Sequence, residues 1–285
     1  MKRSAPQVYI IILLFAPLSI QSQHLKKIQY QDRPHIEIRT KSAIYLYDVQ
    51  GGGFSSLTDP DGVEWIGYKT GNGHYPESAA TEFRGLPNLV YQGEDGGAGH
   101  PGFEKCNSVI LLPNQIRTES LSGLWEWTWT FSEKGALLEI SKTDTSRNYW
   151  FLYEGIPGGS FDPKNQYWGN NKELYSKKTP AFGSDKTIKG KWDWAYFGHE
   201  KSQFCFYVLQ LTPDQHMDVF SYLGSTRKGI KSEDGMVVFG LGRSEGKPLM
   251  KGPNSFYIGF FESHEDPSEV HIPMANLLKN IKSSI

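Results

Sequence analysis

The chain has 285 residues, with 30 basic and 31 acidic side chains and a formal net charge of -1. A nucleic-acid-binding surface requires a clear basic excess, so this balance gives no indication of such a partner. Aromatic residues make up 14% of the sequence and there are 30 glycines, a combination that favours strands joined by many turns.

Residues 1–22 have the pattern of a secretory signal peptide. Lys2 and Arg3 precede an apolar run that is too short for a comfortable membrane span. We expect a secreted or periplasmic mature chain of residues 23–285 with no membrane association; the alternative is an uncleaved N-terminal anchor. Export leaves two states open for Cys106 and Cys205, namely one disulfide or two buried free thiols.

Apolar and alternating segments predict strands along nearly the whole mature chain. In chain order they cover residues 35–49, 62–69, 107–113, 124–131, 136–143, 148–155, 192–198, 203–211, 217–223, 235–242 and 254–263. The segment 124–131 alternates strictly and places Trp125, Trp127 and Trp129 on one face, which we assign to the core. Residues 268–284 alone have helical periodicity. We therefore predict a single all-β domain, a large antiparallel β-sandwich of supersandwich or jelly-roll type with a short C-terminal helix.

Two long segments without a predicted strand, about 70–105 and 155–191, are where we expect the function, because long loops in compact domains are commonly functional. In the first, Glu82 and Arg84 would point the same way from an extended chain, either as an ion pair or with Arg84 binding a carboxylate or sulfate of a ligand. His100 is a candidate acid or base, and Asn88 is a candidate sugar-binding residue.

The second loop follows the stretch NYWFLYEGIPGGSFDP, residues 148–163. Alternation places Trp150, Leu152 and Glu154 on one face of a strand, so that Glu154 is a carboxylate at the strand end. Tyr153 is a further candidate acid or base. Flat aromatic rings beside polar groups are typical of sugar recognition. On this basis the candidate substrate-binding residues of the second loop and its flank are Asp162, Lys164, Tyr167, Trp168 and Trp192.

These residues favour an exported enzyme that acts on a polysaccharide or oligosaccharide. In a lyase acting on a uronic acid, Arg84 would neutralise the carboxylate, and His100 or Tyr153 would transfer protons. A glycoside hydrolase would instead pair Glu154 with Glu82 or Asp162. A non-catalytic carbohydrate-binding protein, or a structural surface protein, needs no catalytic set.

The sequence predicts no cofactor and no dedicated metal site, because it contains neither a CxxC nor an HExxH pattern. Oxygen-rich segments at residues 58–62 and 93–97 could hold calcium, but neither has EF-hand spacing, and both are also typical of ordinary turns.

The segments AIYLYDVQGGGFSSLTDPDGVEWIGYK, TEFRGLPNL, GHPGF and YWFLYEGIPGGSFDP resemble uncharacterised exported β-sandwich proteins of bacterial polysaccharide-utilisation systems. The general layout resembles the galactose-mutarotase-like supersandwich, which hosts epimerases, glycosidases and lyase domains. Epimerases of that fold use a His and a Glu as their acid–base pair. His100 and Glu154 are of these types, but their flanking residues carry no shared motif, so the resemblance implies a fold and assigns them no role.

Overall fold

The computed structural model describes residues 24–68, 83–85, 87–159, 161–180, 187–200, 202–223, 236–244, 247–263 and 266–284. The predicted signal peptide, residues 1–22, lies outside these ranges. Among the described residues, no helix is both long and apolar enough to cross a membrane.

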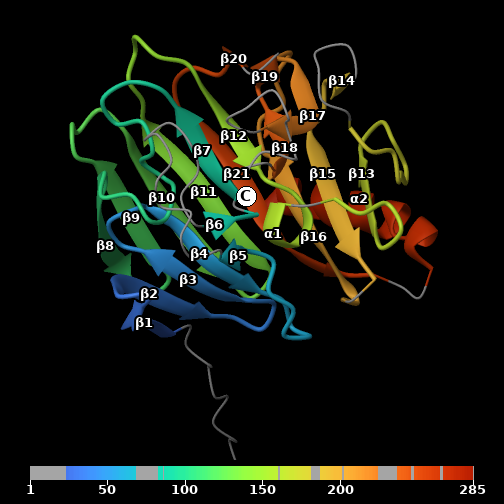
Figure 1. The fold of residues 1–285 in the computed structure, drawn as a ribbon, viewed down its shortest axis with the longest axis horizontal. Coiled ribbons are helices and arrows are strands. Elements are labelled where there is room, and N and C mark those ends of the chain that lie inside the picture. Colours follow the sequence, from blue (N-terminus) through green and yellow to red (C-terminus); the bar gives the residue numbers. More distant parts are fainter. Residues whose placement is uncertain are drawn as a thin grey trace, which may run out of the picture.

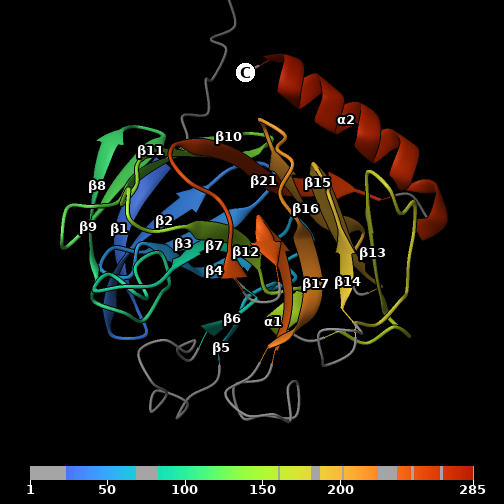
Figure 2. The same ribbon diagram turned by 90° about the horizontal axis from the view of Figure 1, so that it is seen from above.

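Two layers of antiparallel strands make up the body of the molecule (Figures 1 and 2). The first layer is an eight-stranded sheet. Its strands lie in the order β13 (Gln166–Asn170), β15 (Trp194–His199), β16 (Phe204–Gln210), β21 (Asn254–Glu262), β11 (Gly135–Lys142), β10 (Glu126–Ser132), β9 (Gln115–Ser120) and β8 (Cys106–Leu112).

Two smaller sheets form the second layer, in which β4 contacts β7. The four-stranded sheet is β1 (His24–Tyr30), β2 (Arg33–Arg39), β3 (Ile44–Asp48) and β4 (Gly53–Thr58). The five-stranded sheet has the order β14 (Ile188–Gly190), β17 (Asp218–Leu223), β18 (Met236–Leu241), β12 (Tyr149–Tyr153) and β7 (Pro87–Tyr91). Two short pairs complete the strands, β5 (Gly67–Tyr68) with β6 (Phe83–Arg84) and β19 (Arg243–Ser244) with β20 (Lys247–Pro248).

Aromatic side chains fill the space between the layers. Phe54 of β4 meets Trp129 of β10 at 4.9 Å between ring centroids. Phe151 of β12 stacks on Phe256 of β21 at 4.5 Å. Trp125 and Trp127 are also buried, which confirms the predicted core face of residues 124–131. The all-β antiparallel sandwich is thereby confirmed, and its stability comes mainly from the burial of these large rings.

The C-terminal helix α2 (His271–Ser284) follows a short 3-10 turn, η2 (Pro267–Glu269), and lies on the outer face of the eight-stranded sheet (Figure 2). Its buried residues form a second apolar cluster with that sheet. The helix contributes Met274, Leu278 and Ile281 to this cluster. It lies within residues 268–284, where the sequence periodicity predicted a helix.

Three parts of the chain differ from the sequence prediction. Residues 35–49 form a hairpin of β2 and β3, because the Thr40 hydroxyl accepts the Ala43 N–H at 3.0 Å and closes a turn there. The two predicted loops also contain regular elements: β6 and β7 lie in the first, and the helix α1 (Ile156–Gly159) and the strands β13 and β14 lie in the second. Both segments look irregular in the sequence because their strands are short, with 2 to 5 residues each.

Strand β21 pairs along both of its edges, with β16 on one side and β11 on the other. Ile258 lies opposite Val208 of β16 and opposite Ala136 of β11. The last strand of the chain therefore lies in the interior of the eight-stranded sheet.

Cys106 and Cys205 are both buried free thiols, which resolves the alternative that the sequence left open. Cys205 lies 3.2 Å from the Tyr167 hydroxyl. Burial raises the pKa of each thiol to about 12, so neither forms an appreciable thiolate at neutral pH.

We predict that the native protein does not react with a thiol reagent such as DTNB and that two thiols per chain react after unfolding without reductant. Cys106→Ala and Cys205→Ala variants should each release one thiol. An unfolded chain that shows no reactive thiol until it is reduced would contradict this assignment.

Candidate functional site

The candidate site begins where β12 ends, at Glu154. The next residue, Gly155, has a φ of 80°, and a Cβ there would lie 2.3 Å from Val237 Cγ2. Only glycine fits this position, so the chain turns sharply after Glu154. The Glu154 side chain is buried; its Oε2 accepts the Gly85 N–H at 2.9 Å, and its Oε1 lies 3.9 Å from His100 Nε2.

His100 reaches Glu154 from a loop that packs closely on β4. The Gly99 N–H donates to the Gly51 carbonyl at 2.9 Å. A Cβ on Gly53 would lie 2.3 Å from the Gly99 carbonyl oxygen. The absence of a side chain at Gly53 therefore lets the loop approach the sheet and fixes the position of His100.

The imidazole of His100 is held in one tautomer. Its Nδ1 lies 3.0 Å from the Pro101 carbonyl, which can only accept, so Nδ1 donates and the neutral ring carries its lone pair on Nε2. Burial, with a smaller contribution from the nearby charge of Arg84, lowers the pKa of His100 to about 4. At neutral pH the site therefore presents a neutral imidazole whose basic nitrogen faces the Glu154 carboxyl group.

Arg84 completes this cluster from β6. Its side chain is buried, and Nη1 donates to the Phe83 carbonyl at 2.7 Å. A Cβ on Gly159 of α1 would lie 3.3 Å from the Cβ of Arg84, so the glycine-rich turn packs directly on this arginine. The structure thus brings Arg84, His100 and Glu154 together, as a shared site requires.

The cluster continues onto the outer face of the five-stranded sheet, the face opposite the aromatic core. On this face Leu152 lies across from Asn88 of β7, and Trp150 and Leu152 pack with Met236 and Val238. All of these side chains are nearly buried, so a ligand can reach them only if the structure opens there.

Several polar atoms on this face lack a hydrogen-bond partner within the described part of the chain. They are Asn88 Oδ1, Trp150 Nε1 and Nε of Arg243, a residue of β19. Buried polar groups without a partner are rare in folded proteins and require an explanation. The sequence singled out Asn88 but missed Trp150 and Arg243; the signal for Trp150 was its place on the same strand face as Glu154.

Tyr153 does not belong to this site, and its prediction as an acid or base is wrong. It points to the other side of β12, where its ring packs against Phe197 and Phe206 in the core. Burial raises the pKa of its hydroxyl well above the ordinary value. The residue therefore contributes packing to the core.

The expectation that Trp168 and Trp192 lie outside the core is also wrong. Their exposed fractions are 0% and 5%. Trp168 packs edge-on against Phe220, and Trp192 stacks on Phe239. Tyr167 is buried on the opposite side of β13, in the cluster beneath α2. The ring faces of these three residues are therefore not available to a sugar.

Asp162 and Lys164 belong to an exposed turn. Asp162 accepts the Lys164 N–H at 3.0 Å and the Asn165 amide at 2.8 Å. Within the described ranges, no hydrogen bond or ion pair links this turn to His100 or Glu154. Glu82 lies outside the described residues.

The described residues contain no group of three or more side chains placed to hold a metal ion. In the first segment considered for calcium, Asp59 Oδ1 accepts the N–H groups of Asp61 and Val63, each at 3.0 Å, and Oδ2 accepts from Trp65 Nε1 at 2.9 Å. In the second, Asp95 accepts from Ser120 and Ser122. These carboxylates therefore stabilise local structure.

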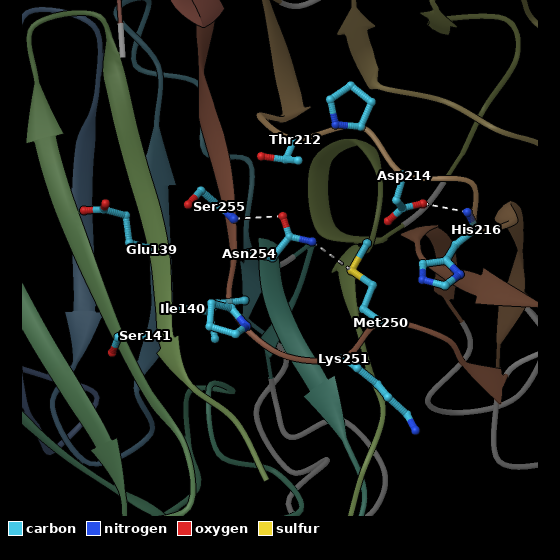
Figure 3. Close-up of a pocket in the computed structure, with 12 residues that line it drawn as sticks. Glu139, Ile140, Ser141, Thr212, Asp214, His216, Met250, Lys251, Asn254 and Ser255 are labelled. Atoms are coloured by element: carbon cyan, nitrogen blue, oxygen red, sulfur yellow. Dashed lines mark hydrogen bonds between the residues drawn. The ribbon is translucent and has the colours of Figure 1, made fainter. Parts of the chain in front are cut away.

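A separate pocket of about 480 Å³ opens at the edge of β11 and β21 (Figure 3). Two of its polar side chains form local hydrogen bonds: Asp214 accepts the His216 N–H at 2.6 Å, and Asn254 accepts the Ser255 N–H at 2.8 Å. No buried polar atom that lacks a partner faces this pocket among its described lining residues. The cluster at Glu154 is accordingly the stronger candidate site.

The chain matches no protein-family model. It also matches no curated protein. Among solved structures it is similar to HI1317, with a TM-score of 0.51 and 10% identity over 84% of this chain and 96% of that one. This likeness is one of fold.

Two further structures align less well. A 4-alpha-glucanotransferase from Thermococcus litoralis aligns with a TM-score of 0.48 and 9% identity, over 84% of this chain and 41% of that one. A galactose mutarotase-like protein from Lactobacillus casei aligns with a TM-score of 0.46 and 8% identity, over 80% of this chain and all of that one.

The lowered pKa of His100 predicts a specific dependence of stability on pH. Between pH 6.5 and about 4 the unfolded chain binds a proton at this residue and the folded chain does not. The free energy of unfolding should therefore fall as pH decreases through this window, by up to about 1.4 kcal/mol per pH unit from this residue.

His100→Gln should flatten this slope relative to the wild type, as measured by urea unfolding at pH 4 to 7. The exposed His216→Gln is the matched control. The raised pKa of Asp218, about 7, acts in the opposite direction, but it is common to all three proteins and cancels in the difference. Equal slopes for wild type and His100→Gln would contradict a neutral buried imidazole.

The buried position of Trp168 predicts a structural role. Trp168→Ala should lower the free energy of unfolding by about 3–5 kcal/mol. Leu174→Ala, at a side chain that is 66% exposed, should change it by less than about 0.5 kcal/mol. A Trp168→Ala protein of wild-type stability that loses sugar binding would instead restore the sugar-platform interpretation.

Proposed function

We propose that this chain is a carbohydrate-active enzyme in which His100 and Glu154 transfer protons to and from a sugar. The observation that carries the proposal is the 3.9 Å approach of His100 Nε2 to Glu154 Oε1 inside a buried cluster beside Arg84. A neutral imidazole beside a carboxyl group, shielded from water and next to a cation, is an arrangement suited to general acid–base catalysis.

The specific reaction we propose is β-elimination on a glycan that contains uronic acid. Arg84 stabilises the negative charge that develops on the uronate carboxylate. His100 Nε2 takes the proton from the carbon beside that carboxylate. The C–H electron pair forms a carbon–carbon double bond while the glycosidic C–O bond breaks, and the leaving oxygen receives a proton from Glu154 or from water.

Two observations favour this reaction over the alternatives. A hydrolase needs a second carboxylate across the bond from Glu154. Of the two candidates, Asp162 instead caps its own turn, and Glu82 lies outside the described residues. A simple binding module would present aromatic platforms, and Trp168 and Trp192 are buried. The assignment to sugars rests on the resemblance to exported proteins of polysaccharide-utilisation systems and on the buried polar atoms of the outer sheet face, which suit hydroxyl groups.

We predict that His100→Gln and Glu154→Gln each lower turnover of the substrate by at least about 100-fold, because a positioned acid or base contributes about that much. The purified protein would be assayed on polygalacturonate, alginate, hyaluronan and neutral glycans, following ultraviolet absorbance of the unsaturated product and release of reducing ends. Arg84→Lys should lower turnover less than the loss of either proton-transfer group.

His216→Gln is the control, because this exposed histidine lies in the separate pocket. Reducing ends without ultraviolet absorbance would identify a hydrolase. Binding without turnover on every glycan would identify a binding protein. Either result, or full activity of His100→Gln, would reject the lyase.

A further inference from the structure

Arg243 is a buried cation for which the described residues supply no carboxylate partner. Its exposed fraction is 2%, and within those residues its side chain forms one hydrogen bond, from Nη1 to the Ser221 hydroxyl at 2.9 Å. Among the described residues, no ion pair includes Arg243. Burial without a partner lowers its pKa to about 10, and desolvation is the sole cause. A buried charge without a partner lowers the stability of the folded state, so the presence of this arginine requires an explanation.

The described residues around Arg243 offer several donors and no carboxylate that pairs with it. Arg243 Nε and Trp150 Nε1 are buried N–H donors without an acceptor among the described residues. The Ser221 oxygen already accepts from Arg243, so its own O–H can donate elsewhere. The guanidinium also lies 5.6 Å from the centre of the Trp150 ring, which holds it in place. Donors that converge around a cation match a ligand that only accepts, namely an oxyanion.

The backbone leaves room for this side chain. A Cβ on Gly240 of β18 would lie 2.8 Å from Arg243 Cδ. Arg243 therefore crosses over β18 at a position without a side chain. The missing side chain at Gly240 thus leaves space for the arginine on the outer face of the sheet.

Arg243 and Arg84 lie at opposite ends of the same sheet face. Gly159 of α1 packs against both Arg84 and Met236, the first residue of β18. Arg243 covers Gly240, four residues after Met236 on that strand. At about 3.3 Å per residue, these two points on β18 are separated by about 13 Å. This distance is longer than one sugar ring, so a sugar ligand that reaches both arginines must contain more than one unit.

We propose that Arg243, Ser221 and Trp150 form a subsite for an acidic group, carboxylate or sulfate, on a sugar unit that flanks the reacting one. This proposal rests on the function proposed above and makes it more specific, because it requires at least two sugar units with an acidic group on the flanking unit. Asn88 Oδ1 lies on β7 across Leu152 from Gly240, and it would accept a hydroxyl of the same ligand.

The test compares oligosaccharide binding by Arg243→Met and Arg39→Met, each in the His100→Gln background so that substrate is not consumed. Arg39 is the matched control, because its side chain is 59% exposed and pairs with Glu37 on β2. Titration calorimetry would use di- to hexasaccharides of polygalacturonate, alginate and hyaluronan as carboxylate probes, carrageenan oligosaccharides as the sulfate probe, and maltohexaose as the neutral probe.

We expect one acidic series to bind and Arg243→Met to weaken it by at least about tenfold, as for loss of a charge-assisted hydrogen bond. Arg39→Met should have no effect, and Arg243→Lys should restore part of the affinity. The series that binds identifies the acidic group. Equal binding by Arg243→Met, or binding of maltohexaose alone or of no probe, would overturn the subsite.

Thermal unfolding separates a binding role from a structural one. If Arg243 serves a ligand, replacing it by methionine removes an uncompensated buried charge, so Tm should stay the same or rise. A large drop in Tm together with unchanged affinity would show that the arginine is structural. Binding is measured without turnover, so the two proposals are tested separately. The Arg243 subsite can be rejected while His100 and Glu154 remain essential for activity, and the proposed reaction can be rejected while the Arg243 subsite still binds an acidic sugar.

Discussion

The contacts of the Glu154 carboxyl group join three segments that are distant in the sequence. One oxygen accepts the backbone N–H of Gly85, and the other faces His100. Residues from β6, from the loop after β7 and from the end of β12 are thereby held around one buried acid. Loss of the carboxylate would leave the Gly85 N–H without its acceptor and an imidazole facing an empty volume, so this group organises the site and also takes part in its proposed chemistry.

The site lies on the side of the five-stranded sheet that does not face the sandwich core. One face of β12 presents Phe151 and Tyr153 to the aromatic interior, while the other presents Trp150, Leu152 and Glu154. A single strand thus contributes to the core on one face and to the candidate site on the other, and the sheet separates the two environments. This arrangement places Glu154 at the end of a rigid element, which favours precise positioning.

The sequence predicted the sandwich, the core tryptophans of β10 and the helix because each depends on local periodicity. It also identified Arg84, His100 and Glu154, but their proximity depends on the close packing of Gly53 against Gly99, which no local pattern encodes. Trp168 and Trp192 were wrongly predicted to bind a sugar, because the sequence around an aromatic residue in a glycine-rich segment does not show whether its ring faces solvent or the core. Arg243 was missed because a single arginine after a strand is ordinary until its burial is known, together with the absence of an ion pair to it in the described part of the chain.

The position of β21 has a consequence for biosynthesis. The ribosome delivers the strands in sequence order, and β11 and β16 are both complete before β21 emerges, yet β21 is the strand that pairs with each of them. During that interval two partial sheets exist with open edges, and open edges invite pairing with other chains. The nascent protein therefore depends on the synthesis of β21, Asn254–Glu262, to close these edges, and a variant truncated before Asn254 would retain both.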